Sequence, residues 1–90
     1  MKRFIYPAIF YKDDDCYRVL FPDLELTTDG KFVEEAYLYA TGFLKEYFIQ
    51  VLKYDFDYNE PTDFLSVKEK GAKSDIVMLV EASIDDKKIK

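Results

Sequence analysis

Residues 3–12 read RFIYPAIFYK and residues 16–21 read CYRVLF, and these two runs decide the fold class. Both are rich in aromatic and β-branched residues, and three aspartates separate them, so they predict a β-hairpin. In the second run alternate residues such as Tyr17 and Val19 share one face, which is the two-residue period of a strand. The first run is apolar on both faces and should lie toward the middle of a sheet. Because proline donates no ladder hydrogen bond, we expect a local irregularity at Pro7.

The segment that follows predicts a third strand and then a long helix. Residues 24–28 are expected to form the strand, which the turn signal Asp29-Gly30 ends. From residue 32 to about residue 53, apolar residues recur at steps of three and four, which predicts a helix with one face on the sheet. The residues expected to face the sheet are Val33, Ala36, Ala40, Phe43, Leu44, Tyr47 and Val51.

The last third of the chain predicts a loop, a helical turn and a final strand. Residues 54–63 are polar and acidic, and a short helical turn around residues 64–69 is ended by Gly71. Residues 76–82 are almost continuously apolar, so we expect a strand covered on both sides that lies parallel beside the first strand. The predicted fold class is α+β, in the order β-β-β-α-β, with one long helix packed on one face of a single sheet.

Length and composition indicate one small folded domain, residues 1–90, with its core at about residues 3–85. The chain is 49% hydrophobic and holds 8 Phe and 8 Tyr, too much apolar material for a disordered segment. Its 13 basic and 18 acidic residues give a formal net charge of -5, which opposes direct binding to nucleic acid and favours a basic protein partner. The apolar N-terminal run is interrupted by Pro7 and by charges, so no signal peptide or membrane span is predicted.

The chain lacks histidine and a glycine-rich phosphate loop, on which several common kinds of catalytic site depend. Histidine is the commonest general base and nitrogen metal ligand, and the three glycines of the chain stand singly. We therefore expect no enzyme activity and no cofactor. The aspartates at 13–15, with Asp23 or Glu25, are interpreted as a solvated turn rather than a metal site. Cys16, the one cysteine, fits a reducing cytoplasm and is interpreted as an unreactive, at least half-buried residue.

The predicted helix carries more apolar surface than one contact with the sheet requires. Residues 54–63 and the C-terminal segment can cover the excess, or it can form an oligomer or partner interface, and both alternatives stay open at this point. In the second alternative Gly42 would be a point of close approach. The oligomer interface would then contain Tyr37, Leu38, Phe48, Ile49 and Leu52.

A series of short motifs resembles the N-terminal domain of the HicB-type antitoxin family. The series consists of Tyr6-Pro7-Ala8-Ile9-Phe10, an acidic turn, residues 17–21, Pro22-Asp23-Leu24, Gly30 and Glu34-Glu35-Ala36. The similarity in order and spacing extends over about residues 3–85. It implies a partial ribonuclease H-like fold and a role in sequestering HicA, a small basic toxin that cleaves messenger RNA. It does not imply nuclease activity, because the central strands lack the carboxylates that such a site needs.

The chain departs from the family pattern in two places. Where the family commonly has Pro-Gly-Cys, this chain reads Glu25-Leu26-Thr27, and Phe32 stands where the family has a helix-capping residue. HicB proteins usually continue into a DNA-binding domain, whereas only residues 86–90 follow the predicted core here, so we expect no sequence-specific DNA binding from this chain alone. The C-terminal residues that could still touch phosphate weakly are Lys87, Lys88 and Lys90.

The leading functional prediction is an antitoxin-like domain that neutralises a HicA-type toxin by binding it. The alternative is a stand-alone HicB-like homo-oligomer that serves as a scaffold or binds another partner. For toxin binding we predict an acidic ridge of Asp23 and Glu25 with the nearby helix start at Glu34, because complementary charge speeds association with a basic protein. No membrane partner is expected.

Overall fold

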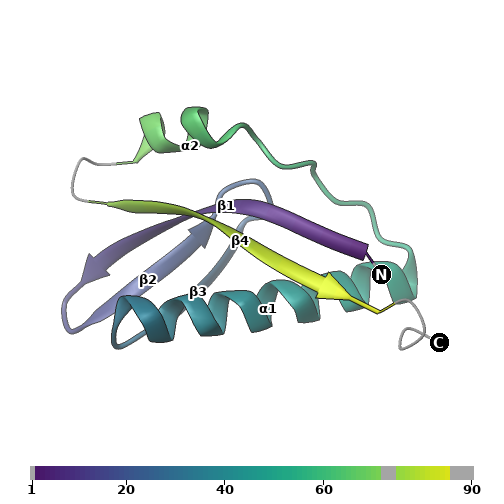
Figure 1. Cartoon of the computed structure of the whole chain (residues 1–90), viewed down its shortest axis with the longest axis horizontal. Coiled ribbons are helices and arrows are strands. Elements are labelled where there is room, and N and C mark those ends of the chain that lie inside the picture. Colours follow the sequence, from purple (N-terminus) through teal and green to yellow (C-terminus); the bar gives the residue numbers. More distant parts are fainter. Residues whose placement is uncertain (1, 72–74, 86–90) are drawn as a thin grey trace.

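The computed structural model describes residues 2–71 and 75–85, which form a four-stranded sheet and two helices. Figure 1 shows the long helix on one side of the sheet. The elements are β1 (Lys2–Asp13), β2 (Cys16–Phe21), β3 (Leu26–Gly30), α1 (Val33–Tyr54), α2 (Phe64–Lys70) and β4 (Ile76–Ile84). The strands are ordered β3-β2-β1-β4, and all neighbours are antiparallel. This confirms the predicted α+β class with one long helix on a single sheet. None of the described helices is long and apolar enough to cross a membrane.

β1 lies in the interior of the sheet, as its apolar character on both faces predicts. Pro7 stands within this strand, opposite Leu79 of β4, and the register with β4 runs unbroken from Lys2 to Phe10. The expected irregularity is therefore absent from this pairing. β2 pairs with β1 only from Ile9 onward, so at Pro7 the strand has a neighbour on one side alone. Proline is tolerated there because no second strand needs its N–H.

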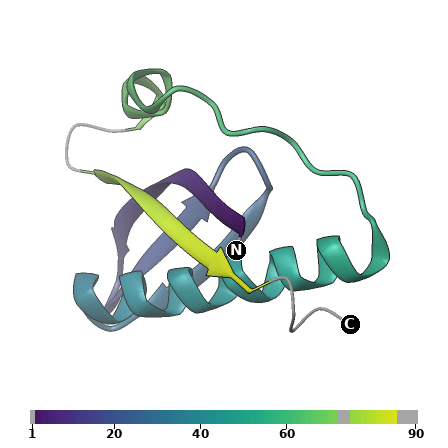
Figure 2. The same ribbon diagram turned by 45° about the vertical axis from the view of Figure 1, so that its right-hand side comes forward.

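The direction of β4 corrects the prediction of a parallel last strand. β4 runs antiparallel to β1, with Ile84 opposite Lys2 and Ile76 opposite Phe10. A parallel strand would have to begin near the end of α1. Instead, residues 55–63 and α2 carry the chain back toward the end of the molecule where α1 begins (Figure 1, Figure 2). β4 therefore starts at that end and runs in the same general direction as α1.

β3 includes the residues that were expected to form a turn. It spans Leu26–Gly30 rather than residues 24–28, so Asp29 and Gly30 continue the strand. Gly30 is buried, and a Cβ atom there would lie 2.5 Å from the backbone nitrogen of Ala36 and 2.7 Å from its Cα. The glycine is required by the close approach of β3 to the first turns of α1, not by a turn.

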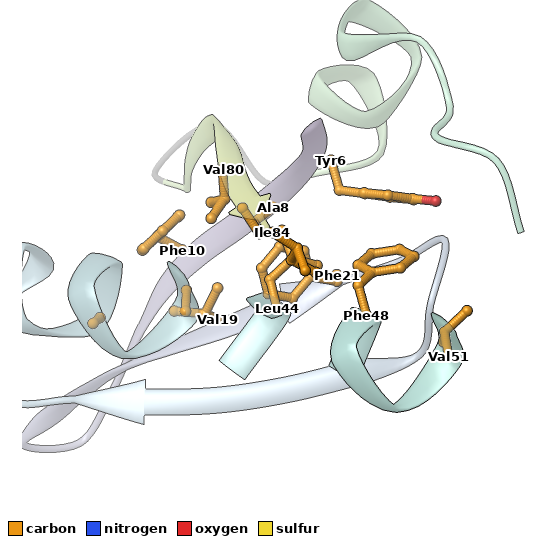
Figure 3. Close-up of a cluster of buried hydrophobic side chains, with 13 residues drawn as sticks. Tyr6, Ala8, Phe10, Val19, Phe21, Leu44, Phe48, Val51, Val80 and Ile84 are labelled. Atoms are coloured by element: carbon orange, nitrogen blue, oxygen red, sulfur yellow. The ribbon is translucent and has the colours of Figure 1, made fainter. Parts of the chain in front are cut away.

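α1 packs on the sheet largely through the residues that the helical pattern predicts. Ala36, Ala40, Leu44 and Val51 are buried, whereas Phe43, which the same pattern places on the sheet, is 38% exposed. Val33 and Tyr47 are half-buried. Figure 3 shows the cluster in which these helix residues meet the sheet. The sheet contributes Tyr6, Ala8, Phe10, Val19, Phe21, Val80, Ala82 and Ile84.

The opposite face of the sheet is covered only in part. α2 lies on that side, and its Val67 is buried (Figure 1). Pro7 and Ile9 are buried there, but Leu79 is 51% exposed and Ile5 is 41% exposed. The prediction that the last strand is covered on both sides is therefore wrong, because a helix of 7 residues is too short to span the sheet.

Candidate functional site

An acidic concavity lies beside the second half of α1, where the β2–β3 connection meets the chain that follows α1. Its volume is about 260 Å³. Two carboxylates come from the β2–β3 connection and a third comes from residues 55–63, so the fold assembles them from distant parts of the sequence. Such a surface suits a basic group rather than an anion. The residues that line it are Asp23, Leu24, Glu25, Tyr47, Asp57, Tyr58 and Asn59.

Asp23 joins the two sides of this concavity. Its carboxylate accepts a hydrogen bond of 2.9 Å from the Thr62 N–H and another from the Thr62 hydroxyl. Asn59 Nδ2 donates to the Asp23 carbonyl at 2.9 Å, and the Tyr6 hydroxyl donates to the Asn59 carbonyl at 2.7 Å. The segment after α1 is therefore fixed to the sheet through both the side chain and the backbone of Asp23.

Tyr6 anchors the inner end of this hydrogen-bond network. Its ring is buried against Phe48, with ring centroids 5.4 Å apart, and its hydroxyl points away from the labelled core side chains (Figure 3). Burial, followed by the nearby Glu60 carboxylate, raises the pKa of this hydroxyl well above its ordinary value. Tyr6 therefore keeps its proton at neutral pH and acts as a hydrogen-bond donor.

Replacing Asp23 with alanine should lower the free energy of unfolding by about 1–3 kcal/mol, because the part-buried Thr62 N–H and hydroxyl lose their acceptor. Urea denaturation measures this loss. The matched control is Asp57→Ala, since Asp57 is exposed and makes no hydrogen bond or ion pair with a described residue. The control should change stability by less than about 0.5 kcal/mol. Equal losses in both variants would contradict the structural role of Asp23.

Glu34, which was predicted to adjoin Asp23 and Glu25, lies elsewhere. It is in the first turn of α1, whereas the concavity adjoins Tyr47, about 20 Å farther along the helix. The structure therefore keeps Asp23 and Glu25 together and separates Glu34 from them. Glu34 instead borders an apolar groove of about 460 Å³, with Val33, Tyr37, Leu38 and Met78.

The helix residues predicted to form an oligomer interface divide between core and surface. Phe48 is fully buried and stacks on Phe4, with ring centroids 3.9 Å apart. The prediction is wrong for Phe48, because a residue packed inside its own chain cannot contact a second one. The remaining four are Leu38, which is 69% exposed, and Tyr37, Ile49 and Leu52, which are half-buried at the margin of the core.

The excess apolar surface of α1 is covered at one end by the segment that follows it. The Tyr58 ring packs edge-on against Phe48, with centroids 5.1 Å apart, and also against Phe4. Farther along the helix Leu38 and Tyr39 remain exposed. A Cβ atom on Gly42 would meet nothing within 4 Å in the described chain, so the close approach expected there at an interface with another chain stays a prediction.

The acidic hairpin between β1 and β2 forms a turn, with Asp14 in the left-handed region at φ 54°. Asp13 pairs with Arg18, and the half-buried Cys16 donates from Sγ to the Asp13 carbonyl at 3.4 Å. Among residues 2–71 and 75–85, no group of three or more His, Cys, Asp or Glu is placed to hold a metal ion. The C-terminal residues considered for phosphate contact, which are Lys87, Lys88 and Lys90, lie outside the described residues.

The sequence-based prediction missed the half of the concavity that residues 55–63 provide. It treated this segment as a polar, acidic loop that could cover the helix and not as part of a binding surface, although residues 54–58 alternate aromatic and acidic side chains. That alternation was an available signal for an exposed surface that is both acidic and aromatic. The contribution of Tyr47 could not be anticipated, because its helical position predicts only that it faces the sheet.

Comparison with known proteins finds a match by structure. No protein-family model matches the chain, and no curated protein sequence does either. The structure is similar to one chain of the "Toxin-Antitoxin complex from Streptococcus pneumoniae", with a TM-score of 0.77 and 23% sequence identity. The similarity covers 91% of this chain and 70% of that chain. At this identity it shows that the two chains share a fold.

Proposed function

We propose that the chain is an antitoxin-like domain that neutralises a HicA-type toxin by binding it, without chemistry of its own. The observation that carries this proposal is the fold shared with one chain of a toxin–antitoxin complex, at a TM-score of 0.77. The HicB-like motifs give the proposal separate support. They are similarities of residue type along the sequence, whereas the structural match compares the path of the backbone. Those motifs lie on β1, β2, β3, the β2–β3 connection and the first turn of α1.

The acidic concavity is the surface best suited to this partner. A toxin that cleaves messenger RNA must attract phosphate with basic residues, and carboxylates compete for the same basic surface. The net charge of -5 steers such a protein toward this chain. Nearby in sequence, Tyr54 and Phe56 are 55% and 58% exposed and stack with centroids 5.7 Å apart. Exposed aromatic rings bind arginine and lysine through cation–π contacts, as Lys53 already does over Tyr54 at 5.4 Å.

Co-expression with a HicA-type toxin from the neighbouring reading frame is the first test. The chain should restore growth and should be recovered with the toxin in a pull-down. If the chain is folded and abundant, yet restores no growth and captures no toxin, the proposal is rejected.

Reversing Glu25 and Asp57 together to lysine should slow association with the toxin by about tenfold or more at low salt, and should flatten its salt dependence. Both residues are exposed and line the concavity, so the reversal changes the local field while leaving the core intact. Asp23 is left unchanged because its carboxylate holds Thr62. Stopped-flow association rates measured over a range of salt concentrations give both quantities.

The matched control reverses Glu34 and Glu69, which are exposed on the first turn of α1 and on α2 and do not line the concavity. This pair changes the net charge by the same amount as Glu25 and Asp57. Its association rate should fall much less, because screening limits the influence of distant charges. Equal slowing by both pairs would show that total charge rather than the concavity steers the toxin, and would reject this placement.

A further inference from the structure

β4 forms one edge of the sheet, and no described residue pairs with its outer side. Figure 2 shows it in yellow, in front of the other strands. Its 9 residues pair with β1 in unbroken register and include no proline and no lysine. Soluble proteins usually interrupt an edge strand with such residues or with a bulge, because an open edge is a template for another strand. β4 carries none of these protections.

The edge is also electrically neutral. Glu81 is the one charged residue of β4, and it forms an ion pair with Arg3 of β1. Leu79 and Ile76 are 51% and 40% exposed, so the strand presents apolar side chains to solvent. An added strand would therefore meet no unpaired side-chain charge along β4.

Pro7 indicates which backbone groups of β4 point outward. In an antiparallel ladder, residue pairs that exchange hydrogen bonds alternate with pairs that do not. Pro7 lies opposite Leu79 and has no N–H to donate. Proline therefore fits best at a pair that exchanges no hydrogen bonds, because at such a pair the β1–β4 ladder loses no bond through the missing N–H. The N–H and C=O groups of Leu79 then point away from β1, and by the same alternation so do those of Glu81. These groups are available to another strand.

We infer that β4 pairs antiparallel with β4 of a second copy of this chain, so that the two sheets become one. A two-fold axis at the middle of the strand sets Val80 opposite its counterpart and pairs all 9 residues. Ile76 then lies opposite Ile84 of the second copy, and exposed apolar surface is covered on both chains. The inference concerns a different edge from the toxin-binding concavity and does not depend on the proposed function.

The helix beside this edge extends the same apolar surface. The groove lined by Tyr37, Leu38 and Met78 adjoins β4, because Met78 belongs to that strand. Leu52 follows Leu38 by two heptads, so both residues lie on the same side of α1. Part of the oligomer surface predicted from the helix is therefore continuous with the free edge of β4.

Charge favours a second copy over a basic toxin as the occupant of this edge. The concavity that attracts basic groups includes the β2–β3 connection and thus lies toward the opposite edge of the sheet. Two copies that each carry a net charge of -5 repel one another least where the surface is neutral. Pairing along β4 also leaves the concavity open to a partner.

Replacing Leu79 with proline removes one outward N–H while leaving the ladder to β1 intact, so it should convert the dimer to a monomer. Sedimentation equilibrium should give a mass near twice 10.7 kDa for the unchanged chain and near 10.7 kDa for Leu79→Pro. The matched control is Leu79→Ala, which shortens the same side chain but keeps the N–H and should remain dimeric. Circular dichroism checks that each variant is folded.

Hydrogen exchange tests the inference without any substitution. The amides of Leu79 and Glu81 should become about tenfold more protected as the concentration of the unchanged chain rises and copies pair. A chain that remains monomeric at about 1 mM overturns the inference, as does a folded Leu79→Pro variant that remains dimeric. A monomeric chain whose affinity for the toxin falls on Leu79→Pro would assign the edge to the toxin and would equally overturn it.

Discussion

Replacing Phe48 with alanine should lower the free energy of unfolding by about 3–5 kcal/mol. The side chain is fully buried and stacks on Phe4, with ring centroids 3.9 Å apart and an interplanar angle of 5°. Tyr47 and Tyr58 meet its ring edge-on at 5.0 and 5.1 Å. Removing the ring leaves a cavity that these rigid neighbours cannot fill. Since a small domain is stable by only about 5–15 kcal/mol, the midpoint of thermal unfolding should fall by at least about 10 °C.

The comparison for this prediction is Leu38→Ala on the same helix. Leu38 is 69% exposed, so its truncation should change the free energy of unfolding by less than about 0.5 kcal/mol if the chain is monomeric in the assay. Urea denaturation at low protein concentration measures both variants under that condition. A loss at Phe48 no larger than the loss at Leu38 would show that Phe48 lies outside the core.

Local patterns were enough to predict most of the sheet and its contact with the helix. The two-residue alternation of residues 16–21 located β2 at its observed bounds, and the helical spacing located Ala36, Ala40 and Leu44 in the core. The same spacing misplaced Phe43 and Phe48, because the face that a helix buries is set by what packs against it. Phe48 is covered by Phe4, which comes from the distant strand β1, and by Tyr58, which comes from the segment that follows α1.

The direction of β4 and the full extent of the concavity could not be predicted, because both depend on the path of residues 55–63. A helix followed by an apolar strand predicts a parallel crossover only when the connection is direct. Here the hydrogen bonds from Asn59 and Thr62 to Asp23 hold that segment across the sheet end. These same contacts bring Asp57 into the concavity that Glu25 also lines. The chain reversal and the third carboxylate of the concavity are therefore consequences of one set of long-range contacts.

Replacing Gly30 with alanine should lower the free energy of unfolding by about 1–3 kcal/mol, because the added methyl group has no space. Its Cβ would lie 2.5 Å from the Ala36 nitrogen and 2.7 Å from the Ala36 Cα, and both are backbone atoms that cannot rotate away. Either β3 or the start of α1 must move. That movement would weaken the pairing of Gly30 with Tyr17 and the packing of the first helical turns on the sheet.

Gly42→Ala supplies the control of opposite sign. Gly42 lies in the interior of α1, and a Cβ atom there meets nothing within 4 Å. Alanine restricts the unfolded chain and favours the helix, so this change should raise the free energy of unfolding by about 0.5–1 kcal/mol. Urea denaturation of both variants should therefore place them on opposite sides of the unchanged chain. Only the absence of a side chain at Gly30 permits the close contact between β3 and the Ala36 backbone of α1. A stabilising Gly30→Ala variant would therefore show that β3 and α1 lie farther apart than this contact requires.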